Sequence, residues 1–220
     1  MEPKFWHDRW QKSEIGFHKH ETNSLLEKFW DQLGVRSDLK HEIFVPLCGK
    51  SLDMRWFLDR GYRVLGIELS ALACEAFFSE NNLIPKRFLQ GRFEVWEAPR
   101  IKILQGDFFD LQQNHLINCS AVYDRAALIA LPVHMRERYS KHLINVVPRS
   151  APMLLLTTEY DQAKRPGPPF SVGEAEVRAL YEPIRQVKLL HTHDAFSPHS
   201  PWAQLGLTWL HEKVYCLLDV

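Results

Sequence analysis

Short runs of β-forming residues alternate with helix-length segments along most of this chain, and this alternation constrains the fold more than any other feature. The run at 42–47 is apolar enough for a buried strand, and a helical stretch that ends at Gly61 follows it. A second strand is predicted at 62–68, before a helix that Ser70 can cap. Further strands are predicted at 93–96, 100–104, 120–124 and 153–157, further helices at 132–147 and 173–181, and closing strands at 205–218. The pattern predicts a doubly wound α/β domain with a mostly parallel sheet covered on both faces.

The composition narrows the range of partners and compartments. Lys+Arg and Asp+Glu both total 27 among the 220 residues, so the chain lacks the basic excess that favours nucleic-acid binding, and we expect a small-molecule partner. The four cysteines form no Cys-x-x-Cys pair, which argues against a zinc ribbon or a disulfide framework and indicates a reducing compartment. The charged amino terminus lacks the apolar core of a signal peptide, and no apolar run is long enough to span a bilayer. We therefore expect a cytoplasmic monomer with no membrane partner.

The turn after the first predicted strand is where a doubly wound sheet would bind its ligand. It covers residues 45–51, Val-Pro-Leu-Cys-Gly-Lys-Ser. A phosphate-binding P-loop needs another glycine at the start of this turn, where Phe44 and Val45 stand, and a dinucleotide fingerprint needs three glycines where only Gly49 is present. The turn therefore lacks a pyrophosphate cradle, whereas a cofactor without phosphates could lie against its backbone.

Two acidic residues after later strands could recognise such a cofactor. Glu68 ends the second predicted strand, at about the 20-residue spacing from Gly49 that suits an acceptor for ribose hydroxyls. A solvated strand-end carboxylate is the alternative. Asp107 could accept from an adenine amino group while Phe108 packs on the ring, and a turn aspartate after Gly106 is the alternative. Together these features suggest an adenosyl ligand such as S-adenosylmethionine.

Six blocks of sequence, in order along the chain, carry a resemblance to a known family. They are FWHDRW at 5–10 with GFH at 16–18, VPLCGKSLD at 45–53, ELS at 68–70, FDL at 109–111, YDRAALIAL at 123–131 and RPGPPF at 165–170. Taken together they resemble the bacterial-type thiopurine S-methyltransferases, within the class I methyltransferases. The resemblance implies one domain over 1–220 with a Rossmann-like, seven-stranded, mostly parallel sheet, helices on both faces and an antiparallel strand near the carboxyl terminus.

The resemblance also implies a binding site for S-adenosylmethionine. Residues 1–34 would form a helical cover over the cofactor. The residues implied to contact the cofactor are Trp10 on that cover, Leu47 and Gly49 near the methionine moiety, Glu68 at the ribose, Asp107 and Phe108 at the adenine, and Arg125 at the boundary with the acceptor.

The acceptor side of the implied site is less complete. Phe17 would border the acceptor pocket, together with Arg125. Some members of the family use a second arginine near the carboxyl terminus to contact the purine, but Arg185 is the last arginine here. The corresponding stretch, 197–202, reads Ser-Pro-His-Ser-Pro-Trp.

Methyl transfer to sulfur needs a soft nucleophile, alignment and a dry site more than it needs a reactive protein side chain. Thiols titrate at about 8.5, and heteroaromatic thiols are more acidic, so a useful thiolate fraction exists without a strong base. We therefore predict no covalent nucleophile and no metal. Arg125 would hold the thiolate or an ordered water, and Trp10 and Phe17 would exclude water and attract the sulfonium.

Several of these residues also have a purely structural interpretation. The tryptophans of 6–10 could form the packing face of a helix. Asp124 and Arg125 could be a strand-end ion pair, and Asp53 a first-turn carboxylate favoured by the helix dipole. Cys48 is interpreted as a small buried residue. The His-x-His pairs at 18–20 and 191–193 lack a third ligand at a telling spacing, so they do not predict a metal site. The Gly-Pro-Pro segment at 167–169 could border the substrate mouth or only connect two elements.

The function predicted from these residues and from the resemblance is S-adenosylmethionine-dependent S-methylation of aromatic or heterocyclic thiols such as thiopurines. The resemblance adds selenium and tellurium compounds as acceptors. Three alternatives remain open: a methyltransferase for another small acceptor, a non-catalytic module that binds the cofactor, and a nicotinamide-dependent oxidoreductase, which the missing glycine-rich loop disfavours.

Overall fold

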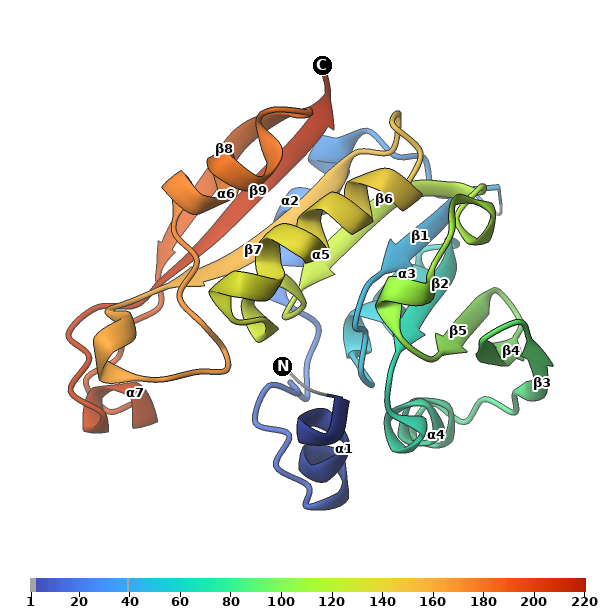
Figure 1. The fold of residues 1–220 in the computed structure, drawn as a ribbon, viewed down its shortest axis with the longest axis horizontal. Coiled ribbons are helices and arrows are strands. Elements are labelled where there is room, and N and C mark those ends of the chain that lie inside the picture. The colour runs from blue at the N-terminus through green and yellow to red at the C-terminus, as the bar shows by residue number, and fades with distance from the viewer. Residues whose placement is uncertain (1–2, 39) are drawn as a thin grey trace.

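The computed structural model describes residues 3–38 and 40–220; residues 1, 2 and 39, which belong to the expected domain, lie outside the described residues. The described part contains one nine-stranded sheet in the order β3-β4-β5-β2-β1-β6-β7-β9-β8 (Figure 1). The strands are β1 (Glu42–Val45), β2 (Arg63–Glu68), β3 (Lys86–Gln90), β4 (Phe93–Ala98), β5 (Ile101–Gln105), β6 (Cys119–Arg125), β7 (Met153–Glu159), β8 (Arg185–Asp194) and β9 (His211–Asp219).

Helices connect most of the strands. The α-helices are α1 (Pro3–Gln11), α2 (Ser24–Phe29), α3 (Leu52–Asp59), α4 (Ala71–Glu80), α5 (Val133–Val146), α6 (Glu174–Tyr181) and α7 (Pro201–Gln204). The 3-10 helices are η1 (Trp30–Leu33), η2 (Phe108–Asp110), η3 (Gln113–His115), η4 (Leu128–Ala130) and η5 (Gln162–Lys164). None of the described helices has both the length and the apolar character needed to cross a membrane.

The centre of the sheet is parallel and both of its edges are antiparallel. β5, β2, β1, β6 and β7 run parallel to one another, and β9 lies antiparallel between β7 and β8. The five parallel strands and β9 agree with the expected mostly parallel sheet with an antiparallel strand near the carboxyl terminus. β4 and β5, which contain the predicted strands at 93–96 and 100–104, pair antiparallel, and β3 adds a further edge strand beyond β4. The sheet is thus two strands wider than expected.

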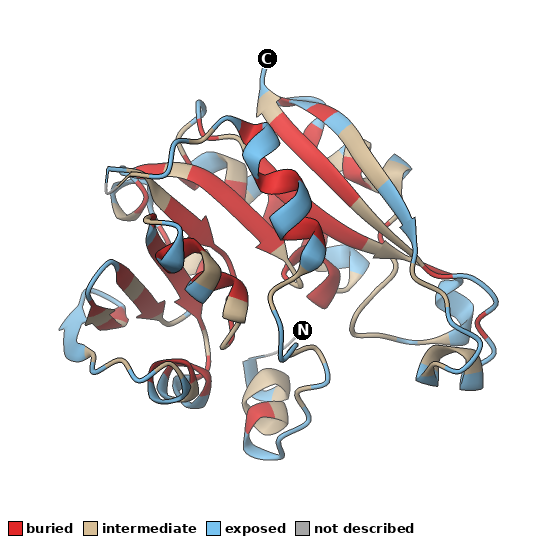
Figure 2. Ribbon diagram, turned by 180° about the vertical axis from the view of Figure 1, so that it is seen from behind, coloured by how far each residue is buried: buried red, intermediate tan, exposed pale blue. Residues whose placement is uncertain are grey.

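Helices cover both faces of the sheet, and each face has its own apolar core (Figures 1 and 2). α5 and α6 cover one face, where Tyr139, Leu143 and Val177 are buried against the strands. α2, η1, α3 and α4 cover the other face, where Trp30 and Phe57 are buried. Nearly continuous burial of the central strands explains why they read as apolar runs in the sequence.

Local signals set the helix boundaries close to where the sequence predicts them. The Ser70 hydroxyl accepts from the backbone N–H of Ala73 and caps α4, and Ser51 caps α3 in the same way. Pro132 stands just before α5. The predicted closing strands differ more: residues 205–210 are not strand, and β9 begins only at His211.

Candidate functional site

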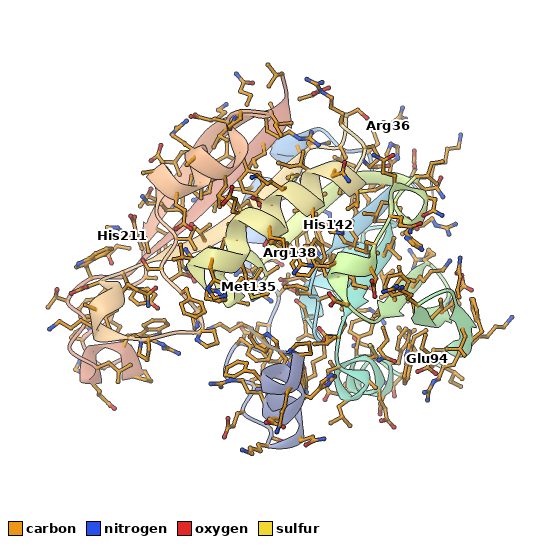
Figure 3. All side chains as sticks on the ribbon, viewed as in Figure 1. Arg36, Glu94, Met135, Arg138, His142 and His211 are labelled. Carbon is orange, nitrogen blue, oxygen red and sulfur yellow. The ribbon has the colours of Figure 1, made fainter. Side chains whose placement is uncertain are left out.

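A cavity of about 1150 Å³ lies at the carboxyl ends of the parallel strands. One part, here called the strand end, is lined by residues that follow β1, β2, β5 and β6. The other, here called the loop end, is lined by residues of 165–169 and 195–210. Side chains of α1 and α5 also line the cavity, among them Met135 and Arg138, which Figure 3 labels along α5. This is the edge of a doubly wound sheet at which ligands bind.

The turn after β1 brings the backbone of Gly49 to the cavity wall. Leu47 and Gly49, which line the cavity, both have positive φ angles, of 46° and 53°. A Cβ added at Gly49 would lie 3.4 Å from the Trp10 ring. Beneath the turn, a Cβ at Gly66 would lie 2.7 Å from the Cys48 sulfur. The two glycines therefore allow a tight turn to sit between β2 and α1.

Glu68 connects this turn to the start of α4. One oxygen of its carboxylate accepts from the Gly49 N–H and the other from the Ser70 N–H, both at 2.8 Å. Burial raises the pKa of Glu68, and the backbone N–H donors partly oppose that shift. An ionised carboxylate has about four acceptor sites, so each oxygen keeps capacity for a further donor. Glu68 is thus a buried, fixed acceptor in the cavity wall rather than a solvated strand-end carboxylate.

Asp107 and Phe108 line the same end of the cavity, after β5. The Asp107 carboxylate accepts from the Phe109 N–H at 2.9 Å and caps η2, so the turn-aspartate interpretation describes its local role. The side chain is nevertheless exposed on the cavity side, where it has further acceptor capacity. Phe108 is buried, with its ring 4.8 Å from that of Tyr139.

α1 and the segment that follows it place aromatic rings on the cavity. Trp10 is buried and its ring lies 5.7 Å from that of Phe17 in an edge-to-face arrangement; both residues line the cavity. Trp6 contacts Phe17 from the other side. α2 and η1, by contrast, pack on the sheet. Within the described part of the expected cover over 1–34, only α1 and the segment that follows it border the cavity extensively.

The structure corrects the interpretation of Asp124 and Arg125 as an ion pair. Successive residues of a strand point to opposite faces. Asp124 accordingly faces α5, where it accepts from the Leu128 N–H and the Tyr139 hydroxyl. Arg125 faces the other side of the sheet, where its Nε donates to Asp53 at 2.5 Å.

Asp53 is more than a first-turn carboxylate. It is fully buried and accepts three hydrogen bonds, from Arg125, from the Tyr123 hydroxyl and from the Asn23 N–H. Arg125 also donates to the Ser51 hydroxyl at 2.9 Å. The Arg125 guanidinium is therefore held in one orientation at the cavity wall. The sequence did not predict this network because its members lie far apart in the chain. The position of Asp53 inside the VPLCGKSLD block at 45–53 was the one feature that could have indicated a role for it.

The remaining candidates show no sign of a metal site or a reactive thiol in the part of the chain that the structure describes. The rings of His18 and His20 are 5.2 Å apart and those of His191 and His193 are 6.3 Å apart, and residues 3–38 and 40–220 contain no group of three or more potential metal ligands. All four cysteines are free and buried, and burial raises the pKa of the Cys48 thiol. Arg185 is buried and donates to backbone carbonyls, including that of Ala151, away from the cavity. The Pro168 and Pro169 segment does border the cavity.

Comparison with known proteins identifies the family. Residues 1–219 match the family model described as Thiopurine S-methyltransferase (TPMT). The chain belongs to the thiopurine S-methyltransferase family. A protein of Pseudomonas fluorescens (strain Pf0-1) named Thiopurine S-methyltransferase is 45% identical over 220 residues, which cover all of both chains. One of the same name from Nitrosospira multiformis is 43% identical over 218 residues, 99% of this chain and 98% of its own.

Solved structures confirm the fold on which this thiopurine S-methyltransferase family member is built. A SAM-dependent methyltransferase from Anabaena variabilis aligns with a TM-score of 0.64 and 14% identity, covering 99% of this chain and 95% of its own. The Burkholderia thailandensis 1,6-didemethyltoxoflavin-N1-methyltransferase, solved with its substrate and S-adenosylhomocysteine, aligns with a TM-score of 0.66 and 13% identity, covering 99% and 87%. The predicted class I methyltransferase fold is therefore confirmed.

Proposed function

We propose that this protein transfers the methyl group of S-adenosylmethionine to the sulfur of aromatic or heterocyclic thiols such as thiopurines. The observation that carries this function is the buried Glu68 carboxylate fixed to the Gly49 backbone at the wall of a large cavity, in a chain that belongs to the thiopurine S-methyltransferase family. The turn offers a nucleoside acceptor but no phosphate cradle, which argues against a nicotinamide dinucleotide.

The residues at the strand end fit S-adenosylmethionine. The cavity of about 1150 Å³ exceeds the range of about 300–1,000 Å³ that is usual for one small ligand, so it has room for cofactor and acceptor together. Glu68 would accept from the ribose hydroxyls, Asp107 would accept from the adenine amino group beside Phe108, and the backbone near Leu47 and Gly49 would border the methionine moiety. Trp10, on α1, would cover the methionine moiety.

The main task of the protein in this reaction is to position the cofactor and the acceptor thiolate relative to each other. When bound, S-adenosylmethionine would supply the methyl group: the acceptor thiolate would form a bond to the methyl carbon as the bond between that carbon and the sulfonium sulfur breaks. The electron pair of the broken bond would stay on the cofactor sulfur, and the proton of the thiol would already have passed to solvent. Arg125, fixed by Asp53 and Ser51, would hold the thiolate by a charge-assisted hydrogen bond. Phe17 and Trp10 would keep water from the reacting atoms. Positioning of this kind can supply about 7–11 kcal/mol of the barrier.

The same proposal covers further acceptors, the cellular compartment and the oligomeric state. Selenium and tellurium compounds are soft nucleophiles and would enter the same site. We place the protein in the cytoplasm because its four cysteines are free thiols in this fold. It would act there as a monomer on small molecules, without nucleic acid.

The cofactor half of the proposal is tested at Glu68. Glu68→Gln should weaken binding of S-adenosylmethionine by about 1–3 kcal/mol, because it loses charge-assisted hydrogen bonds to the ribose. Isothermal titration calorimetry measures this loss, and Glu75→Gln on the exposed side of α4 is the matched control. Unchanged affinity in a folded Glu68→Gln protein would remove Glu68 from the cofactor site.

The transfer half is tested with an aromatic thiol and, in parallel, with selenide and tellurite. Product formation from the thiol distinguishes an enzyme from a module that only binds the cofactor. Arg125→Ala should lower kcat/KM for the thiol more than it lowers cofactor affinity. Equal losses in both would reassign Arg125 to cofactor binding.

A further inference from the structure

The segments that line the loop end of the cavity are held in place by hydrogen bonds and by a small apolar core. The Tyr160 hydroxyl donates to the Pro169 carbonyl at 2.6 Å, and the Phe170 N–H donates to the Ile129 carbonyl at 2.7 Å. Tyr160, Leu207 and Leu210 form a small apolar core of their own, with Trp202 packed against it. This core fixes the segments 165–169 and 195–210 relative to each other.

Arg165 stands on this wall with most of its hydrogen-bonding capacity unused. Its guanidinium carbon lies 4.2 Å from the centre of the Trp202 ring, and one terminal nitrogen donates to the Pro168 carbonyl at 3.0 Å. Within the described part of the chain, no carboxylate lies within ion-pair distance of Arg165. A guanidinium carries five N–H donors in a fixed fork, so a group oriented by one carbonyl and one ring still presents donors to a planar anion.

The charge of the cavity favours an anion as well. The basic lining residues are Arg9, Lys19, Lys50, Arg125, Arg138 and Arg165, and the acidic ones are Glu14, Glu68, Asp107 and Glu212. Asp53, Glu80 and Glu14 pair with three of the basic residues. Lys19, Arg138 and Arg165 have no such partner among residues 3–38 and 40–220, and Glu212 is the one lining carboxylate there with no ion pair or hydrogen bond. With Asp53 and Glu80 included, these positive and negative charges balance in number. The positive sulfonium of a bound cofactor would therefore leave the site net positive, which favours an anionic acceptor.

We propose that Arg165, stacked on Trp202, binds a carboxylate on the acceptor, and that the preferred acceptors are aromatic thiols that carry a carboxylate on the ring. This inference rests on the proposed S-methylation and adds the class of thiol. The carboxylate pairs with the guanidinium fork in its plane, the ring of the acceptor lies among the aromatic and proline side chains of the loop end, and the thiol points toward Arg125 at the strand end.

The test compares 4-mercaptobenzoate with its methyl ester, which has the same ring and a similar electronic effect but no charge. Wild-type protein should show a lower KM for the acid. Arg165→Met should raise the KM for the acid by about 10- to 100-fold, the loss expected for a charge-assisted pair. The KM for the ester should change by no more than about twofold, because the uncharged ester makes no ion pair with Arg165 that the substitution could remove.

Two variants serve as controls. Lys164→Met removes the same charge from the neighbouring exposed residue, which does not line the cavity, and it should leave both KM values unchanged. Arg165→Lys keeps the charge but loses the fork, and it should give an intermediate KM for the acid. Calorimetry with the methylated product, 4-(methylthio)benzoate, provides a readout that does not depend on turnover.

The possible results distinguish a failure of the carboxylate site from a failure of the proposed S-methylation. Wild-type protein that methylates acid and ester with equal KM would overturn the carboxylate site and leave the S-methylation intact. An equal loss with both thiols in Arg165→Met would show that Arg165 only supports the wall, which also overturns the inference. Wild-type protein that binds S-adenosylmethionine and methylates neither thiol would refute the proposed function itself.

Discussion

The two ends of the cavity are built by different kinds of structure. The strand end is made by the last residues of the central parallel strands and by the turns that follow them. Its Glu68 and Asp53 carboxylates are buried and accept hydrogen bonds from fixed backbone N–H groups and from Arg125. The loop end is made by segments that leave the sheet and is supported by a core of three buried side chains. The strand end should therefore be costly to alter, whereas the loop end should tolerate change and so can vary its specificity.

The largest expected effect tests the strand end at Asp53. Asp53→Ala should lower the free energy of unfolding by about 3–5 kcal/mol, because it leaves the Arg125 charge buried without its partner. Urea denaturation measures this change. Asp59→Ala on the same helix removes a carboxylate from an exposed pair with Arg55 and should cost only about 0.5 kcal/mol. Similar losses in the two variants would contradict a special role for the buried network.

The pH dependence of stability tests the same region at Asp124. Burial raises the pKa of Asp124 from 3.8 to about 6, against the lowering effect of its Leu128 and Tyr139 hydrogen bonds. Between these values the folded protein keeps a proton that the unfolded chain has released, so this group stabilises the fold below the unfolded pKa and the contribution is lost as pH rises through about 6.

The measurable consequence is a difference between two titrations. From about pH 4 to above pH 6, the unfolding free energy of the wild type should fall relative to that of Asp124→Asn by about 3 kcal/mol. Denaturation at a series of pH values measures both proteins. Parallel curves would show that Asp124 has its ordinary pKa in the folded state.

A smaller effect tests how closely the turn after β1 packs on β2. Gly66→Ala places a Cβ 2.7 Å from the Cys48 sulfur, and overpacking of this kind should cost about 1–3 kcal/mol. Cys48→Ala in the same protein should restore much of the loss. Gly16→Ala is the control, since a Cβ there meets nothing within 4 Å. If the double variant is as unstable as Gly66→Ala, the contact with Cys48 is not the cause.

The smallest effect is expected at the loop end. Trp202→Ala removes ring contacts with Tyr160 and Arg165 and should cost about 0.5–1.5 kcal/mol of unfolding free energy. Trp30→Ala, in the fully buried core behind the sheet, should cost about 3–5 kcal/mol. A loss at Trp202 as large as that at Trp30 would mean that the loop end is packed as tightly as the main core of the sheet.

The same contrast explains which elements could be predicted. The central strands and their helices have continuous apolar runs and clear caps, and the sequence predicts them correctly. β3 was missed because all five of its residues are exposed, so it has no apolar alternation. β8 was missed because only its first half contacts the core, while its second half is largely polar and exposed.

The site shows a similar division. Every residue proposed for the cofactor and acceptor lies on the wall of one cavity. Those that follow strands meet there because the carboxyl ends of parallel strands lie at one edge of the sheet, whereas Trp10 and Phe17 come from α1 and the segment after it. The alternative in which Asp124 and Arg125 form an ion pair does not hold, because successive residues in a strand face opposite sides of the sheet. Arg165 and Trp202 gained no role from the sequence, since no local pattern shows that a loop after β7 and a short helix before β9 lie against each other.

The sequence by itself determined the order of the central strands and helices, the glycine turn without a phosphate cradle and the family, because each of these depends on local periodicity, spacing or short motifs. Only the tertiary structure decided that Asp53 holds Arg125 and that Arg165 stacks on Trp202. Those contacts join segments many residues apart, and their existence depends on how the sheet twists and how its loops return over its edge, which no local pattern specifies.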